Sequence, residues 1–262
     1  MAQLSMEAGH ASVTIDADRG GRVASLIVDG RPLLLVTPSH DPLQWGSYPM
    51  VPWAGRIRDG RFRFGGVVHE LPRNLPPHSA HGVGFTSGWE VDDDHTLGLD
   101  LGPPWPLGGR AVQRFELDRG GLTMTLAVTA ERDMPVMVGW HPWFNRRLPA
   151  PGGGEVEARL RFRARSMYEL DDEAIPTGRL VAPPPGPWDN CFTGVEEGPT
   201  IEWPGLVELR LSSSCDHWVV YTEPEHSLCV EPQSAAPDEF NREPAVLPAG
   251  ERAEAWFRLD WA

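Results

Sequence analysis

The chain contains no lysine, and all 23 of its basic side chains are arginines. A Schiff-base lysine and a phosphate-loop lysine are therefore excluded. Cysteine is scarce as well. Cys191, Cys215 and Cys229 are an odd number and form no Cys-x-x-Cys pair, which argues against a disulfide framework and against a thiolate zinc site. So few cysteines are typical of a reducing compartment, and we expect a cytoplasmic protein.

Long apolar runs and clusters of positive charge are also missing. The longest aliphatic run, Leu33–Val36, is far too short to span a bilayer, and residues 1–16 lack the basic and apolar regions of a signal peptide. The net charge of −14 argues against nucleic acid or an anionic membrane as the main partner. We therefore expect neither nucleic acid nor a membrane as a partner.

Helical periodicity is hard to find, whereas strand patterns recur along the chain. The 28 glycines and 27 prolines lie between short apolar segments, which is typical of many strands joined by turns. Three hairpins are predicted: Ala11–Ile15 with Val23–Val28, Arg61–Phe64 with Val67–Leu71, and Ala111–Leu117 with Leu122–Thr129. Further strands are expected at Leu33–Val36, Met134–Val138 and Val156–Ala164. Because Pro149–Gly154 reads as a turn, we expect one all-β domain over residues 1–262.

The stretch Val138–Asn145, Val-Gly-Trp-His-Pro-Trp-Phe-Asn, follows an apolar strand and concentrates aromatic rings around one histidine. Pro142 cannot donate to a sheet ladder, so the strand is expected to stop or bulge near His141. Aromatic rings beside a titratable group suit a sugar or nucleobase pocket. A histidine buried in an aromatic core cluster is the alternative interpretation.

Glu231 has the same context as His141, because each follows a hydrophobic strand and each precedes a proline. Two antiparallel strand ends can meet at one edge of a sheet although they are far apart in the chain. A carboxylate that takes a proton and an imidazolium that gives one would form a general acid–base pair, each member worth on the order of 10²–10⁴ in rate. No Gly-x-Ser-x-Gly elbow and no Gly-x-Gly-x-x-Gly turn occur, so serine hydrolysis and dinucleotide binding are not indicated.

Other polar residues have two interpretations each. Arg56 is either a surface arginine or a fork-shaped donor for a sugar hydroxyl or a carboxylate. Asp189, which stands among aromatic residues, is either an ordinary turn residue or a carboxylate that binds a pair of hydroxyls. His78 and His81 lie three apart in a loop rich in Pro and Gly, where functional sites often occur. Two prolines precede them and no Cys or acidic ligand is near, so a metal site is not favoured.

Five blocks of the sequence, taken together and in order, resemble the aldose 1-epimerase (galactose mutarotase) family. The blocks are Trp53-Ala-Gly-Arg56-Ile with Gly60, His81-Gly82, Trp140-His141-Pro142-Trp143-Phe144-Asn145, Trp188-Asp189-Asn190-Cys191-Phe192, and Cys229-Val-Glu231-Pro-Gln233. The resemblance implies a β-supersandwich of antiparallel strands with a sugar cleft on one concave face, no cofactor and no metal. It implies that the protein interconverts the α and β anomers of a free aldose.

The resemblance also implies a role for each candidate residue. Glu231 looks like the base that takes the proton of the C1 hydroxyl, and His141 looks like the acid that protonates the ring oxygen. His81 is similar in position to a second polarising group near that oxygen. Arg56 and Asp189 are similar to residues that bind sugar hydroxyls.

Three residues depart from the family pattern. Gly55 stands where the family often has asparagine, which removes one hydrogen-bonding side chain. Trp143 replaces the usual tyrosine after His-Pro, and His78 is an additional histidine before His81. The sugar is therefore not predicted, and neither is the aromatic residue that stacks on it, for which Trp218, Trp143 and Trp45 are the candidates.

Two alternatives to a mutarotase of free sugars stay open. A hexose-6-phosphate 1-epimerase would need several arginines at the mouth of the cleft, and Arg58, Arg61 and Arg63 are the candidates, although alternation along a hairpin would split them between its faces. A carbohydrate-binding protein that has lost turnover is the other alternative, and displacement of Glu231 or His141 from the pocket would favour it. In each case we expect a small-molecule sugar as the partner and a monomer or a homodimer.

Overall fold

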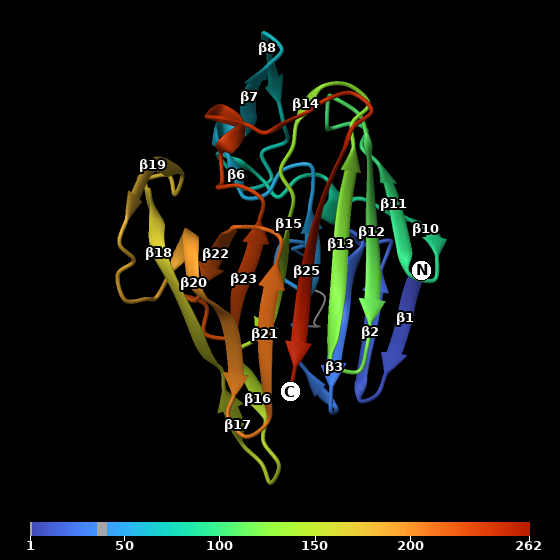
Figure 1. Cartoon of the computed structure of the whole chain (residues 1–262), viewed down its shortest axis with the longest axis vertical. Helices are drawn as coiled ribbons and strands as arrows, with labels where there is room; N and C mark the ends of the chain where they lie inside the picture. The colour runs from blue at the N-terminus through green and yellow to red at the C-terminus, as the bar shows by residue number, and fades with distance from the viewer. Residues whose placement is uncertain (1, 36–40) are drawn as a thin grey trace.

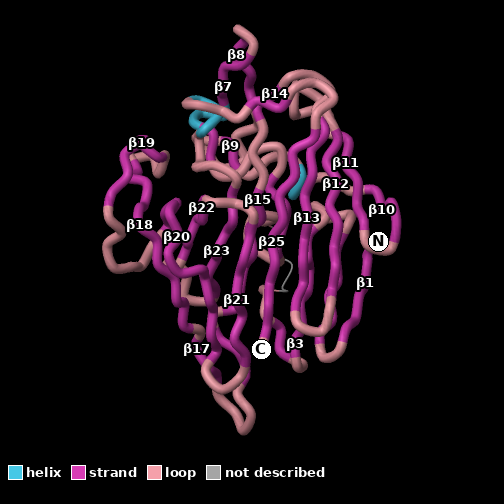
Figure 2. Tube along the Cα trace, in the orientation of Figure 1, coloured by secondary structure: helices cyan, strands magenta, loops and turns pink. Residues whose placement is uncertain are grey.

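The structure is a computed structural model in which residues 2–35 and 41–262 are described. Three short 3-10 turns are the only helical segments in these two ranges, and nearly all other regular structure is antiparallel strand, so the predicted all-β class is confirmed (Figures 1 and 2). No helix in the same ranges is long and apolar enough to cross a membrane. The predicted strand Leu33–Val36 is reduced to an isolated bridge between Leu34 and Phe144, and Val36 lies outside the described residues.

The elements, in chain order, are β1 (Gln3–Ala8), β2 (Ala11–Asp16), β3 (Arg22–Val28), β4 (Arg31–Pro32), β5 (Ser47–Met50), β6 (Arg56–Ile57), η1 (Arg58–Gly60), β7 (Arg61–Phe64), β8 (Val67–Glu70), β9 (Ser79–Ala80), η2 (Gly84–Thr86), β10 (Glu90–Asp93), β11 (Thr96–Asp100), β12 (Arg110–Leu117), β13 (Gly121–Thr129), β14 (Met134–Pro135), β15 (Gly139–Asn145), β16 (Arg147–Pro149), β17 (Glu155–Glu157), β18 (Arg159–Leu170), β19 (Pro176–Val181), β20 (Asp189–Trp203), β21 (Val207–Ser213), β22 (His217–Tyr221), β23 (Ser227–Gln233), η3 (Glu239–Asn241), β24 (Val246–Leu247) and β25 (Arg252–Trp261).

One continuous antiparallel sheet folds into two layers. The first layer pairs strands in the order β1–β2–β3–β5–β15–β23–β22. The second layer runs β10–β11–β12–β13–β25–β21. The long strand β20 joins them, because its residues 189–193 pair with β22 and its residues 200–203 pair with β21. Between these halves Gly194 adopts a φ of +65°, a conformation that favours glycine and lets the strand bend.

The apolar core lies between the two layers. The rings of Trp140 in β15 and Trp218 in β22 contact Phe257 in β25 of the opposite layer, with ring centroids 5.9 and 6.2 Å apart. Successive side chains of a strand point to opposite faces of a sheet. The neighbours His141 and Val219 therefore face away from the core, toward the outer concave surface of the first layer.

The prediction that a strand stops or bulges near His141 is wrong. The apolar stretch Met134–Val138 contributes only the short strand β14, and β15 begins at Gly139 and continues through Pro142. On one side β15 is held by β5, where His141 lies opposite Tyr48. The proline is tolerated because its missing donor affects only the other side of the strand.

On that other side the ladder between β15 and β23 is interrupted. The last pairs before and after the gap are Gly139 with Gln233 and Trp143 with Cys229. Two prolines, Pro142 of β15 and Pro232 of β23, lie within this gap. Pro142, which was expected to end the strand, instead leaves a short stretch of the sheet without backbone hydrogen bonds between β15 and β23.

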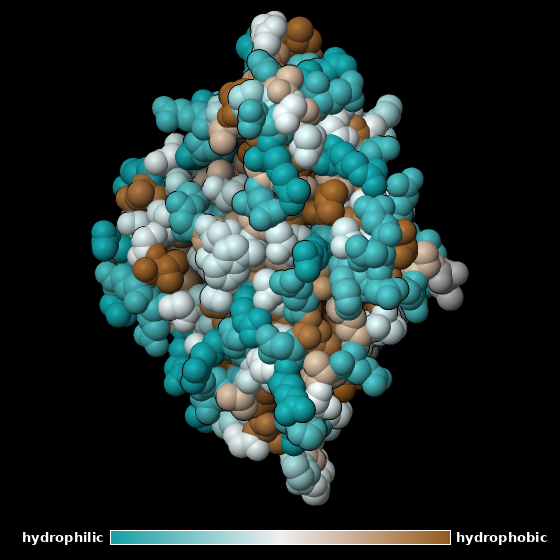
Figure 3. Space-filling model, turned by 45° about the vertical axis from the view of Figure 1, so that its right-hand side comes forward, coloured by the Kyte–Doolittle hydropathy of each residue, from teal (hydrophilic) through white to brown (hydrophobic). Residues whose placement is uncertain are grey.

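The three predicted hairpins are confirmed as β2–β3, β7–β8 and β12–β13. The predicted strand Val156–Ala164 is instead split at Ala158 into β17, which pairs with β16, and β18, which pairs with β20. The backbone of Ala158 donates to Arg146 and fixes this break. On the surface in Figure 3, hydrophilic residues dominate and hydrophobic ones are scattered.

Candidate active site

All five residues predicted from the sequence line one cleft, whose volume is about 220 Å³. They are Arg56, His81, His141, Asp189 and Glu231. The cleft opens on the concave face of the first layer, above β15, β22 and β23. Its volume lies just below the usual range of small-molecule pockets, roughly 300–1,000 Å³, as suits a ligand of monosaccharide size.

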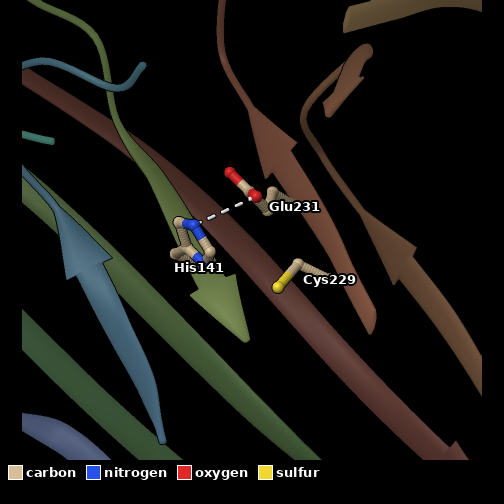
Figure 4. A group of neighbouring side chains, drawn as sticks. All are labelled: His141, Cys229 and Glu231. Carbon is tan, nitrogen blue, oxygen red and sulfur yellow. Dashed lines mark ion pairs between the residues drawn. The ribbon is translucent and has the colours of Figure 1, made fainter. Parts of the chain in front are cut away.

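His141 and Glu231 form the floor of this cleft. The Nε2 atom of His141 lies 3.2 Å from the Oε1 atom of Glu231, and both side chains are almost completely buried (Figure 4). Strand β15 supplies the histidine and β23 the glutamate, across the gap in their ladder. The other carboxylate oxygen, Oε2, accepts a hydrogen bond of 3.2 Å from Gln233 Nε2. The strands thus bring the pair together as predicted, but from within β15 and β23 rather than from strand ends.

The imidazole of His141 is fixed by three neighbouring rings. It stacks on Tyr48 at 4.9 Å with an interplanar angle of 28°, and on Trp143 at 5.1 Å and 14°. The ring of His81 meets it edge to face at 5.1 Å and 88°. Trp143 therefore packs on the histidine in the place where the family has tyrosine.

Of the three aromatic candidates for stacking on a ligand, two point elsewhere. Trp218 belongs to the core, and Trp45 is covered by the guanidinium of Arg22, which lies 4.2 Å from its ring centroid. Trp143 does line the cleft, as do Tyr48 and Tyr221.

Burial dominates the protonation of the central pair. It raises the pKa of Glu231 well above its usual value, and the carboxylate of Asp189 raises it further. It lowers the pKa of His141 well below its usual value, and His81 adds to the drop. Both shifts favour uncharged groups, so the proton that the pair shares belongs to the carboxyl. This differs from the expected pair of imidazolium and carboxylate.

His81 reaches the cleft from a sharp turn. It adopts a φ of +62° and its backbone N–H donates to Gly55, while the next residue, Gly82, has a φ of +76°. A Cβ atom at Gly82 would lie 2.0 Å from the carbonyl oxygen of Val51, so only glycine fits there. Burial, followed by the charge of Arg56, lowers the pKa of His81 to about 3. The ring is therefore neutral near pH 7.

Arg56 and Asp189 form an ion pair at the wall of the cleft, with Nη2 and Oδ2 3.5 Å apart. Arg56 also donates to the carbonyl of Ala174 at 3.3 Å. Their side chains are 27% and 34% exposed, so both still present polar atoms to the cleft. Asp189 is the first residue of β20 rather than a turn residue. Both side chains thus line the cleft, and their roles in binding stay predictions.

Two departures from the family pattern have structural explanations. A Cβ atom at Gly55, whose φ is +66°, would lie 2.6 Å from Cγ of Pro237, so this cleft wall has no room for a larger residue. His78 is buried outside the cleft lining. Its Nδ1 accepts from the backbone of Asp59 at 3.2 Å, and its Nε2 lies 3.2 Å from the carbonyl oxygen of Glu173. His78 thus joins two loops and does not pair with His81.

Two parts of the site were missed from the sequence. Gln233, which holds Glu231, could have been found because residues two apart share a face of a strand. Tyr48 could not, since its contact with His141 depends on the pairing of β5 with β15, which no local pattern specifies.

The comparisons with known proteins identify the family of the chain. The aldose 1-epimerase family model matches residues 2–260. The uncharacterised protein YphB of Escherichia coli (strain K12) is 28% identical over an alignment of 284 positions, gaps included, which covers 96% of this chain and 97% of that protein. Galactose mutarotase of Mus musculus is 29% identical over 159 residues, which cover 57% of this chain and 46% of that protein.

Solved structures show the same fold. A galactose mutarotase-like protein from Clostridium acetobutylicum superimposes with a TM-score of 0.83 at 21% identity and covers 98% of this chain and 94% of that one. The galactose 1-epimerase from Lactobacillus acidophilus NCFM gives a TM-score of 0.79 at 16% identity, with 98% and 92% covered. The predicted galactose mutarotase-like β-supersandwich is therefore confirmed. Since the family match spans nearly all of the sequence, the chain belongs to the aldose 1-epimerase family.

Proposed function

We propose that the protein is a mutarotase that interconverts the α and β anomers of a free aldose. The observation that carries this proposal is the contact of 3.2 Å between His141 Nε2 and Glu231 Oε1 on the floor of a cleft of monosaccharide size. An acid and a base that face one small polar ligand are what ring opening and closing require.

The proposed reaction moves two protons in opposite directions. The carboxylate of Glu231 takes the proton of the C1 hydroxyl while the imidazolium of His141 gives a proton to the ring oxygen. The bond between C1 and the ring oxygen breaks, and C1 becomes an aldehyde. Rotation about C1–C2 presents the other face of the carbonyl, and the same steps in reverse close the ring. The number of protons on the pair is the same before and after the cycle.

The pair needs one shared proton for this chemistry. That proton belongs to Glu231, because burial raises the pKa of Glu231 and lowers that of His141. Its transfer to His141 gives the arrangement that reacts, and the net charge of the pair does not change. A sugar bound between the two groups takes part in this redistribution through its own C1 hydroxyl and ring oxygen.

Three further side chains have proposed roles in binding. Arg56 and Asp189, a mutually paired donor and acceptor on the wall, would bind adjacent sugar hydroxyls. His81 lines the cleft and its ring meets that of His141 edge to face, so we place this ring against a polar atom of the sugar near His141.

The charge distribution favours an uncharged sugar over a sugar phosphate. Arg58 binds Asp171 and Glu173, Arg61 binds Glu70, and Arg63 donates to a backbone carbonyl. Of the arginines in the described chain, Arg56 alone lines the cleft, and Asp189 already pairs with it. Because Asp41 also lines the cleft, a phosphate would meet more negative than positive charge.

A carbohydrate-binding protein without turnover is less favoured. Displacement of Glu231 or His141 from the cleft would favour that alternative, and both residues line the cleft. The stack of Tyr48, His141 and Trp143 also holds the imidazole in one plane, which suits proton transfer better than binding alone.

Polarimetry tests the proposal. Freshly dissolved α-D-glucose or α-D-galactose should lose its excess optical rotation faster with the protein than without it. Glu231→Gln, which keeps the shape of the side chain, should slow this acceleration by at least about 100-fold without changing the unfolding midpoint. The matched control Glu225→Gln alters an exposed carboxylate and should leave the rate unchanged.

Two results would contradict the proposal. If the protein accelerates mutarotation of no sugar in a panel of aldoses and their 6-phosphates, sugar binding without turnover would remain as the function. Near-normal activity of Glu231→Gln would remove Glu231 from the mechanism.

A further inference from the structure

We propose that the floor of the cleft is also a binding site for a thiophilic divalent cation, Zn²⁺ or Cd²⁺. The ligands are Nε2 of His141, a carboxylate oxygen of Glu231 and Sγ of Cys229. These atoms lie within 4.8 Å of one another, and Figure 4 shows the side chains directed at the space between β15 and β23. The Cys pattern of the sequence did not indicate this site, because its ligands come from separate strands.

The backbone explains why the three donors converge. Cys229 and Glu231 are two residues apart on β23, so they share the face that is opposite to the core. His141 faces them from β15 across the interrupted part of the ladder. On a tetrahedral ion the ligand atoms are roughly 3.3–3.8 Å apart, given metal–ligand distances of about 2.0–2.3 Å. The His141–Glu231 distance of 3.2 Å is close to this spacing, and the Cys229 sulfur, which lies within 4.8 Å of both, has to move closer by at most about 1 Å.

The donor set selects the class of ion. One thiolate, one imidazole and one carboxylate suit Zn²⁺ or Cd²⁺ and do not suit Mg²⁺ or Ca²⁺, which prefer oxygen ligands. Three protein ligands leave a fourth position, which faces the cleft and would be filled by water. As the sulfur–metal bond forms, the S–H bond of Cys229 breaks and its proton passes to solvent. The proton shared by His141 and Glu231 leaves too, since the ion takes both lone pairs.

The ion at this site would act as an inhibitor rather than as a resident cofactor. A metal-bound imidazole ordinarily donates its second ring N–H to a fixed acceptor. Nδ1 of His141 is buried and finds no partner in the described part of the chain, so the site lacks that support. An ion on Nε2 and the carboxylate would occupy the proposed acid and base together. The inhibitory effect therefore rests on the proposed function, whereas binding of the ion does not.

The other two thiols provide matched controls. Cys191 and Cys215 are free and buried, as is Cys229. Within the described ranges, the cluster at Cys229 is the only group of three metal-ligating side chains that meets the same distance limit. Replacement of Cys191 therefore removes a buried thiol without removing a ligand.

Calorimetric titration of the chelator-treated full chain with Zn²⁺ and with Cd²⁺ tests the site. We expect one ion to bind per chain, and Cd²⁺ to give the ultraviolet charge-transfer band of a cadmium thiolate. Cys229→Ser should lose the band and weaken binding by about 100-fold or more. Cys191→Ser should keep both the band and the affinity. Absence of the band in the unmodified protein, or equal behaviour of the two variants, would overturn the proposal.

Two further arms keep the test decisive. If Cys229→Ser does not fold, as judged by its thermal unfolding, Glu231→Gln should weaken Cd²⁺ binding at least about tenfold, and unchanged affinity would overturn the site. In polarimetry, Zn²⁺ should suppress the acceleration and a chelator should restore it. If the metal-free protein does not accelerate the mutarotation of any aldose, the proposed function is wrong, but the titration still tests the metal site.

Discussion

Acid should weaken the folded state through His81. Burial, and then the charge of Arg56, lowers the pKa of this histidine from 6.5 to about 3 in the folded protein. The unfolded chain therefore binds a proton at a pH where the folded chain does not. The contribution of His81 to stability is complete above pH 6.5 and is lost progressively as the pH falls toward 3.

The size of the effect follows from the shift. A displacement from 6.5 to about 3 corresponds to a ceiling of roughly 5 kcal/mol for His81. Only part of this is reached between pH 7 and pH 5, roughly 2 kcal/mol from the same linkage relation. The ring is partly exposed to the cleft, so solvent screening reduces the expected loss to about 1–2 kcal/mol.

Urea unfolding at pH 7 and pH 5 measures this loss. Other buried groups titrate in the same range, so the unmodified protein is compared with His81→Asn at both pH values. Asparagine is chosen because His81 has a φ of +62°, which asparagine tolerates better than most residues. The free energy of unfolding of His81→Asn should fall by about 1–2 kcal/mol less than that of the unmodified protein. His10→Asn, an exposed change, should follow the unmodified protein.

One result would refute this reasoning. If His81→Asn and the unmodified protein lose the same stability between the two pH values, the imidazole is not held neutral by burial. The neutral ring assigned to the cleft wall would then be wrong, and its proposed contact with the sugar would have to be an imidazolium contact.

Three more predictions concern activity and stability. The kcat/KM of chelator-treated protein, measured by polarimetry, should depend on pH as a bell-shaped curve. At acid pH a second proton binds to His141, whose pKa is lowered by burial, and inactivates the pair; at alkaline pH Glu231, whose pKa is raised, loses the shared proton. A flat pH profile would count against the pair. Asp189→Asn should raise KM by about 10-fold or more with a smaller change in kcat, because charge-assisted hydrogen bonds to hydroxyls are lost; an unchanged KM would place the sugar away from Arg56 and its partner. Arg22→Met should lower the free energy of unfolding, measured in urea, by roughly 3–5 kcal/mol, because the fully buried guanidinium donates to four backbone carbonyls. A loss below about 1 kcal/mol would show that water can donate to these carbonyls in place of the guanidinium.

The fold class could be predicted because its signals are local. A period of two between Leu122 and Thr129, with a Gly-Gly turn before it, specifies a hairpin without reference to the rest of the chain. The break at Ala158 was missed because it depends on a hydrogen bond to Arg146, which lies between β15 and β16. Where a strand ends is decided by its partners, and those partners are distant in sequence.

The sequence allowed the residues of the candidate site to be predicted, but not how these residues are arranged. His141 and Glu231 carried a shared local context, His-Pro and Glu-Pro after apolar residues, and the structure brings them to 3.2 Å. The contributions of Tyr48 and Cys229 could not be predicted from the sequence, since both depend on the register of neighbouring strands. Likewise the sequence indicated only that Gly55 removes a hydrogen-bonding side chain. The structure adds a steric reason for glycine at this position, because a Cβ atom there would lie too close to Pro237.

The shared proline context explains how a sheet can open at its centre. Trp143 donates its backbone N–H toward Gly46, on the β5 side, so the neighbouring position 142 faces β23. An ordinary residue there could donate its N–H to β23 and continue the ladder, whereas proline cannot. Proline has no N–H, so the unbonded stretch carries no orphaned donor at this position. The prolines after His141 and Glu231 thus allow β15 and β23 to stay in one sheet. At this point the side chains of His141 and Glu231 make the contact between the strands, in place of backbone hydrogen bonds.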